Sequence, residues 1–228
     1  MKKLLFSLML ASSLSPAIAD PIQSTDFRTA HSMGCMMMRE CVDKVDRIKD
    51  TEDLADKLTK GRHLVRYTQY KEEIDGIISE LDQMGVGVYL ASDHYFVRGT
   101  AGIYYTVGNN FFLNERYVHD PHQLVKTLRH EAWHAAQDAM AGTIDNNFIA
   151  IIRDEEDVPR EYVLQAEIAY GENNPALPWE KEAKWAGGTE NMTLEVLRII
   201  NETGGRPWEI IEPTPLTREY LEEHGYID

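Results

Sequence analysis

Residues 120–142 read DPHQLVKTLRHEAWHAAQDAMAG, and this stretch decides the fold prediction because it holds a complete helix with its own start and stop signals. Asp120 is a good N-cap, and Pro121 suits the first helical position. Apolar residues then recur at helical spacing, and Gly142 can end the helix. The stretch therefore predicts a helix of roughly 20 residues.

The pentapeptide His130-Glu131-Ala132-Trp133-His134 lies inside this helix and has the form H-E-x-x-H. Residues four positions apart share a helical face, so the two imidazoles can bind one tetrahedral Zn²⁺. Glu131 can then act as general base towards a zinc-bound water. The pattern predicts a metal site in which His130 and His134 are ligands and Glu131 is the catalytic residue.

A catalytic zinc site needs a third protein ligand and an open position for water. Downstream of the motif the only histidine is His224, so a carboxylate is the better candidate. We expect Glu182, because it falls on the apolar, inward face of its predicted helix, where an unpaired carboxylate is costly. Two alternatives stay open. Glu167 lies beside apolar residues, and Glu180 is expected on the outward face, paired with Lys184.

The other segments predict an α+β domain in which a small, mostly antiparallel sheet packs on the motif helix, with further helices before and after. Apolar residues at helical spacing predict helices before the motif over 42–48, 51–58 and 74–84, and after it over 159–170, 178–186, 193–200 and 216–223. Short β-branched or aromatic runs separated by turn residues predict three or four strands among 86–90, 95–97, 102–107 and 110–113. Gly108-Asn109 fits a hairpin turn between the last two strands.

The N-terminus has the pattern of a secretory signal peptide. Two lysines are followed by an apolar run over 4–14, and Ala17-Ile18-Ala19 then gives a small-x-small cleavage site. We expect cleavage after Ala19, a single domain over 20–228, and a secreted or periplasmic protein. No other apolar stretch is long enough to cross a membrane.

The net charge indicates which classes of partner are unfavourable, and the cysteine content bears on disulfide formation. The formal net charge of −15 disfavours binding to nucleic acid, because the chain repels phosphate backbones. Cys35 and Cys41 are the only cysteines. An even number in an exported chain favours a disulfide between them, with a break in the surrounding helix near Gly34.

The region 102–186 resembles the zincin metallopeptidases, and within them the gluzincin-like kind with a Glu third ligand. The string over 130–137, H-E-x-x-H-x-x-Q, is similar to a form found in small metallopeptidases, and Glu180-Lys181-Glu182-Ala183 is similar to the E-x-E-A string that often carries their third ligand. The chain lacks the third His of metzincins and the N-E-x-x-x-D form of thermolysin-like ligand helices. The resemblance implies zinc, peptide-bond hydrolysis, and a small sheet beside the motif helix.

These observations give the hypothesis of an exported zinc-dependent peptidase that acts on a peptide or protein substrate. Edge strands at 102–107 or 110–114 could pair with an extended substrate, and His94, Tyr104, Tyr105 and Tyr170 could stabilise an oxyanion. Two alternatives share the scaffold: a secreted, non-catalytic binding or structural module, and a zinc-dependent cell-wall amidase.

Overall fold

The computed structural model describes residues 10–13, 33–40, 45–58, 67–142, 149–205 and 223. The described part is an α+β fold, as expected, in which most strands precede a run of helices. The strands are β1 (Leu10–Ser13), β2 (Val45–Arg47), β3 (Gly87–Ala91), β4 (Thr100–Tyr105) and β5 (Asn110–Asn114). The α-helices are α2 (Thr51–Leu58), α3 (Lys71–Gln83), α4 (Pro121–Met140), α5 (Arg160–Tyr170), α6 (Leu177–Gly188) and α7 (Met192–Thr203).

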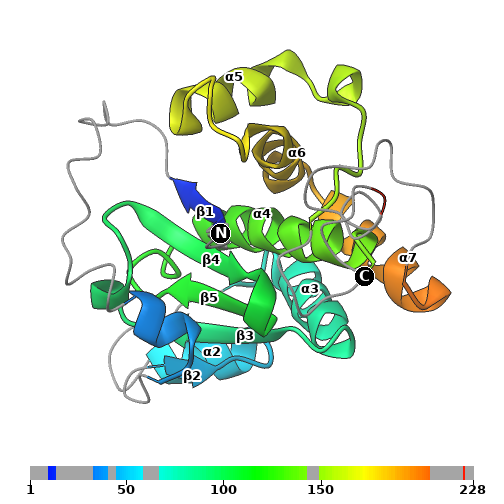
Figure 1. Cartoon of the computed structure of the whole chain (residues 1–228). Helices are drawn as coiled ribbons and strands as arrows, with labels where there is room; N and C mark the ends of the chain where they lie inside the picture. Colours follow the sequence, from blue (N-terminus) through cyan, green and yellow to red (C-terminus); the bar gives the residue numbers. More distant parts are fainter. Residues whose placement is uncertain are drawn as a thin grey trace.

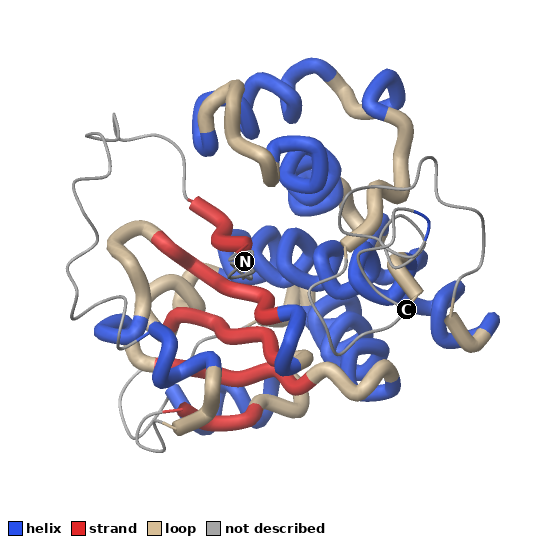
Figure 2. Tube along the Cα trace, in the orientation of Figure 1, coloured by secondary structure: helices blue, strands red, loops and turns tan. Residues whose placement is uncertain are grey.

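One mixed sheet organises the first half of the fold, with strand order β1-β4-β5-β3-β2. β3 and β5 run parallel, and the other three pairings are antiparallel, so the expectation of a mostly antiparallel sheet is confirmed. The hairpin expected between the last two strands is also present: Tyr105 pairs with Asn110, and Asn109 takes the left-handed conformation at the turn. Figure 2 shows the strands gathered on one side of the molecule.

Helix α4 lies against one face of the sheet, between the sheet and α6, and α5 packs on α6 (Figure 1). Successive side chains of each strand point to opposite faces of the sheet, as in any β-strand. Val88 and Phe111 belong to the core shared with α3, α4 and α7, whereas Tyr89 and Phe112 stack in a smaller core on the opposite face. The larger core contains the fully buried Trp133 of the motif, which anchors α4 in place.

The motif helix begins and ends where the sequence predicts. The Asp120 carboxylate accepts hydrogen bonds from the backbone N–H groups of His122 (2.9 Å) and Gln123 (3.3 Å), and Pro121 is the first helical residue. Gly142 has a φ of +106°, which ends the helix. The helices predicted over 51–58, 74–84, 159–170, 178–186 and 193–200 are present as α2, α3, α5, α6 and α7, and 216–223 lies outside the described residues except for Glu223.

Two expectations about local structure are wrong. The helix predicted over 42–48 is replaced, in its described part, by strand β2, because pairing with β3 satisfies this backbone; the pairing continues past the strand, where Ile48 N–H donates to the Val88 carbonyl. The strand predicted over 95–97 does not form. Asp93–Tyr95 is instead a short 3₁₀ turn, and β2 and β1 supply the additional strands of the sheet.

The N-terminal expectations are only partly within the described residues. Residues 10–13 of the expected leader form β1 and pair with β4, and the rest of 1–19 lies outside them. Cys35 is disulfide-bonded, and Cys41 lies outside the described residues. The helix around Cys35 runs through Gly34 and ends in a turn at 38–39, where Arg39 has a φ of +57°, so the expected break lies further on. Among the described helices, none has the length and apolar character that a membrane span requires.

Candidate metal centre

Close packing of α6 on α4 brings together His130, His134 and Glu180. Small residues allow this approach: a Cβ at Gly187 would lie 3.2 Å from the Lys126 carbonyl oxygen and 3.3 Å from the His130 Cβ. The His130 Nε2 atom lies 3.3 Å from one Glu180 oxygen, and the His134 Nε2 atom lies 3.7 Å from the other. The histidine rings are nearly perpendicular, at 88°.

The geometry of these three side chains fits a metal ion. One ligand atom from each lies within 4.8 Å of the others, and ligands about 2.1 Å from a tetrahedral ion lie about 3.4 Å apart. His130 Nε2, His134 Nε2 and both Glu180 oxygens are buried and have no hydrogen-bonding partner at normal bonding distance among the described residues, although Tyr170 and Lys184 act on the Glu180 carboxylate. Buried polar atoms without partners are costly, and a cation between them removes that cost.

Burial sets the protonation of the cluster. It lowers the pKa of His130 well below its ordinary value and lowers the pKa of His134 to about 4, so both imidazoles are neutral at pH 7 and able to bind a metal. Burial also raises the pKa of Glu180, although the nearby His134, Lys184 and Tyr170 oppose this. A cation would favour the ionised form of the same carboxylate.

Each histidine ring also interacts with a group outside the metal group. The Ala183 backbone carbonyl acts on the His130 imidazole as a hydrogen-bond acceptor, which partly opposes the effect of burial on the pKa of that ring. His134 Nδ1 lies 2.7 Å from the Gln137 side-chain oxygen. Both rings thus direct Nε2 towards Glu180, and contacts of this kind orient histidine ligands in metal sites.

Glu131 is fully buried where α4 meets β4. Its carboxylate accepts a hydrogen bond of 2.9 Å from the backbone N–H of Tyr104. Gly102 makes this contact possible, because a Cβ there would lie 2.7 Å from the Thr127 Cγ2 and 3.0 Å from the Glu131 Cγ. The sheet therefore fixes the position of the Glu131 carboxylate, which belongs to the residue directly after His130.

Glu182, the expected third ligand, is not the carboxylate that comes together with the two histidines; Glu180 is. Glu182 is buried, as predicted, but its two oxygens accept four N–H donors, from Trp133, Gln137, Ile152 and Arg153, at 2.7 to 3.0 Å. These hydrogen bonds, and no metal, compensate its burial. The cost of burial remains visible, because it raises the Glu182 pKa to about 7.

Glu180 occupies the position expected of a solvated surface residue, yet it is fully buried. The reason is that α6 is covered on two sides, by α4 and by α5, so its presumed outward face also lies inside the protein. Glu167, the other alternative, is half-buried on α5 and is not among the three side chains that come together.

Lys184 is a residue of the site that the sequence reasoning assigned to the surface. Burial lowers its pKa, and the charges that act on it most strongly are Glu180 and then Glu131. Its ammonium lies 5.5 Å from the centre of the Tyr170 ring. Lys184 follows Glu180 by four residues and therefore shares its helical face. Assigning Glu180 to the interior would have predicted that Lys184 lies beside the metal group.

Among the four candidates for oxyanion stabilisation, Tyr170 is the one whose side chain acts on a member of the metal group, Glu180. The Tyr104 hydroxyl instead donates to Asp138 at 2.7 Å in the core. His94 is exposed, and the Tyr105 hydroxyl contacts the Met38 sulfur.

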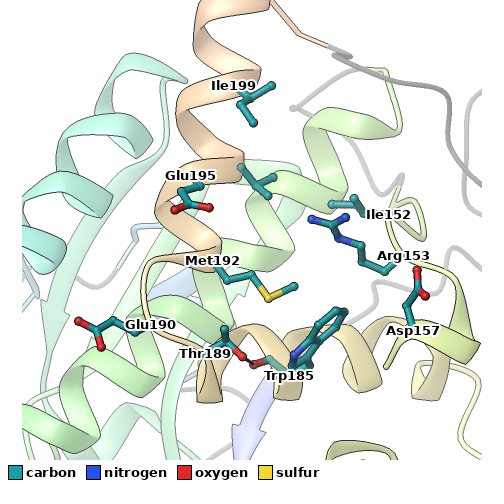
Figure 3. Close-up of a pocket in the computed structure, with 10 residues that line it drawn as sticks. Ile152, Arg153, Asp157, Trp185, Thr189, Glu190, Met192, Glu195 and Ile199 are labelled. Carbon is teal, nitrogen blue, oxygen red and sulfur yellow. Dashed lines mark hydrogen bonds between the residues drawn. The ribbon is translucent and has the colours of Figure 1, made fainter. Parts of the chain in front are cut away.

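A separate open pocket of about 680 Å³ lies between α6, α7 and the segment over 152–157 (Figure 3). Trp185, Met192 and Ile199 give it an apolar wall, and Arg153 and Asp157 border it. None of the three metal-group side chains lines it.

Comparisons of the chain with protein-family models, with curated proteins and with solved structures gave no match.

Proposed function

We propose that this protein is a zinc-dependent peptidase, with His130, His134 and Glu180 as zinc ligands. The observation that carries the proposal is the buried group of two neutral imidazoles and one carboxylate, whose ligand atoms make no hydrogen bond at normal distance among the described residues. Two nitrogens and one oxygen form a donor set typical of catalytic zinc, which keeps a fourth position for water or substrate. The H-E-x-x-H spacing adds a buried carboxylate beside that group.

Zinc in such a site lowers the pKa of a water molecule and polarises the substrate carbonyl. Glu131 then accepts a proton from the attacking water and delivers it to the leaving amine nitrogen. The backbone N–H of Tyr104 holds the Glu131 carboxylate in place through these two transfers. Lys184 of α6 acts on both Glu180 and Glu131, and Tyr170 of α5 acts on Glu180. We assign to these two residues the positive charge and the hydroxyl group that would stabilise the negative carbonyl oxygen.

The edge of β4 is the proposed binding place for an extended peptide. β1 occupies this edge and contacts α4, with Leu10 paired to Tyr104 and Ser12 paired to Gly102. These two β4 residues also contact Glu131. Export with removal of the leader would uncover the edge, and a substrate strand in the place of β1 would pass beside the general base.

The test is metal content and hydrolysis of an unstructured protein such as casein by residues 20–228. We expect one zinc per chain, loss of zinc in His130→Ala and Glu180→Gln, and retained zinc with lost hydrolysis in Glu131→Gln. Glu167→Gln, a half-buried carboxylate outside the metal group, is the matched control and should behave as the unmodified protein. Zinc that is sub-stoichiometric and unaffected by His130→Ala would refute the site.

Complete burial of the group favours one second candidate, a binding module with a structural metal. Structural zinc sites are closed and contribute directly to folding, whereas catalytic ones keep an open position. Chelator-sensitive cleavage of casein decides for the peptidase. A large fall in thermal stability on zinc removal, without hydrolysis by the loaded protein, decides for the structural site.

A further inference from the structure

We propose that Glu182 and Gln137 form a positioning relay that fixes the tautomer of His134 and so presents its Nε2 atom to the metal. The inference rests on the metal site of the proposed function. It assigns a role to Gln137, three residues after the second motif histidine, and a new role to Glu182. Neither side chain contacts the ion in this arrangement; both act through the imidazole.

The relay starts from the Glu182 carboxylate, which acts as a hydrogen-bond acceptor towards all of its neighbours. Three of the groups around the Glu182 carboxylate can only donate hydrogen bonds: Trp133 Nε1–H at 3.0 Å, Ile152 N–H at 2.8 Å and Arg153 N–H at 2.7 Å. Two of them are backbone groups, so their positions follow from the chain path between α4 and α6. The Glu182 oxygens therefore accept, and the remaining neighbour, Gln137, must donate to them.

Gln137 transmits this direction because its amide has one donating end and one accepting end. Its Nε2 atom lies 2.8 Å from a Glu182 oxygen and 3.3 Å from the Trp179 carbonyl oxygen, and both of these are acceptors. Its Oε1 atom consequently faces His134 Nδ1, at 2.7 Å. An amide oxygen can only accept, so Nδ1 carries the ring proton and Nε2 keeps the lone pair that binds a metal.

His134 needs such a device, whereas His130 does not. The partner of His130 is the Ala183 backbone carbonyl, which can only accept and cannot turn around. The partner of His134 is a side-chain amide, which would serve equally well after a half-turn with its NH₂ group towards the ring. Glu182 and the Trp179 carbonyl exclude that half-turn. The two glutamates of α6 thus have separate tasks: Glu180 faces the ion, and Glu182 faces the amide.

The decisive variant is Glu182→Gln, which keeps the size of the side chain. The two backbone N–H groups hold its new oxygen, so its NH₂ group meets the Gln137 NH₂ group. Gln137 is then expected to turn, and the His134 proton to move to Nε2. Long-range proton–nitrogen NMR of the metal-free protein at pH 8 should show His134 protonated at Nδ1 before the substitution and at Nε2 after it. Chelator competition should show zinc binding weakened about 10- to 100-fold.

A compensating double variant separates positioning from general damage. In Gln137→Glu with Glu182→Gln, the residue at 137 can only accept and the residue at 182 can donate to it, so His134 should regain the Nδ1 proton and zinc affinity should recover. Tyr67→Phe is the matched control, because it removes a buried hydrogen bond to Val118 without touching the relay, and it should change neither readout.

The relay is overturned if Glu182→Gln keeps the Nδ1 proton on His134, or if the double variant fails to restore it. Should Glu182→Gln not fold, Gln137→Leu removes the acceptor and must give the same tautomer change. Because the NMR measurement uses metal-free protein, it decides on the relay even if the chain proves to bind no zinc, a result that would refute the proposed function alone.

Discussion

Adding one methyl group at Gly102 should damage the site through the sheet. A Cβ there would lie 2.7 Å from the Thr127 Cγ2, 3.0 Å from the Glu131 Cγ and 3.3 Å from the Phe111 Cε2, whereas carbon atoms pack best at about 3.5–4.0 Å. Gly102→Ala must therefore move β4 away from α4 or displace Glu131. Overpacking of this kind costs about 1–3 kcal/mol, and a misplaced catalytic group loses on the order of 10- to 100-fold in kcat.

Differential scanning calorimetry and peptide hydrolysis measure the two effects. At about 2–4 °C per kcal/mol for a protein of this size, Tm should fall measurably, while zinc content stays at one per chain. Thr127→Ser removes the closest carbon and should recover part of the Tm in the Gly102→Ala background. Gly76→Ala is the control for overpacking away from the site, because the three atoms nearest to its new Cβ all belong to the Leu194 side chain, between α3 and α7. Unchanged Tm and kcat in Gly102→Ala would refute the proposed contact between strand and base.

Three further outcomes are expected. Arg129→Met leaves the buried Glu73 carboxylate without its ion-pair partner and should cost about 3–5 kcal/mol in urea unfolding; a loss under about 1 kcal/mol would contradict this. Burial raises the pKa of Glu182 to about 7 from 4.5, so between these values the native state binds more protons than the unfolded chain, and this carboxyl makes the metal-free protein more stable as pH falls. Glu182→Gln should remove up to about 1.4 kcal/mol per pH unit of that slope, and identical slopes at pH 5–7 would refute the assignment. Lys184→Met removes a cation beside Glu180 and Glu131, so hydrolysis should slow while zinc binds several-fold more tightly; weaker zinc binding would contradict the electrostatic argument.

Local signals were sufficient for the motif helix and for most of the helical framework. The helix signals act on backbone groups only a few residues away, and each is present as expected at Asp120, Pro121 and Gly142. The same holds for the hairpin at Asn109, which needs only a left-handed turn residue between two apolar strands. A sequence contains these signals in full, because the groups that satisfy them are adjacent in the chain.

Long-range pairing was the part that the sequence did not reveal. Val45 and Ile48 have the spacing of a helix, yet this segment forms β2, because the edge of β3 offers it hydrogen bonds. Only the folded sheet creates that edge, so a periodicity of three residues was a misleading guide. β1 is a similar case, since its apolar residues have the pattern of a leader and still pair with β4.

The two buried glutamates of α6 show why the assumption of a single inward face was too simple. A carboxylate on an apolar face needs a partner, and this rule correctly placed Glu182 in the interior. The rule does not say whether the partner is a metal or a set of N–H groups, and here it is the latter. Glu180 could not be found from α6 alone, because both α4 and α5 pack on this helix, and Glu180 lies against the two histidines of α4.

The buried charges around the metal group give a reason to prefer catalysis to a structural role. With both imidazoles neutral, two carboxylates, Glu180 and Glu131, act on Lys184, and Lys126 acts on it as a second cation. A divalent cation held by the proposed ligands would add to these two ammonium groups and leave the site with an excess of positive charge. Such an excess is complementary to a negative oxygen that develops during reaction. A purely structural ion gains nothing from a neighbouring lysine, because two like charges at close range repel each other.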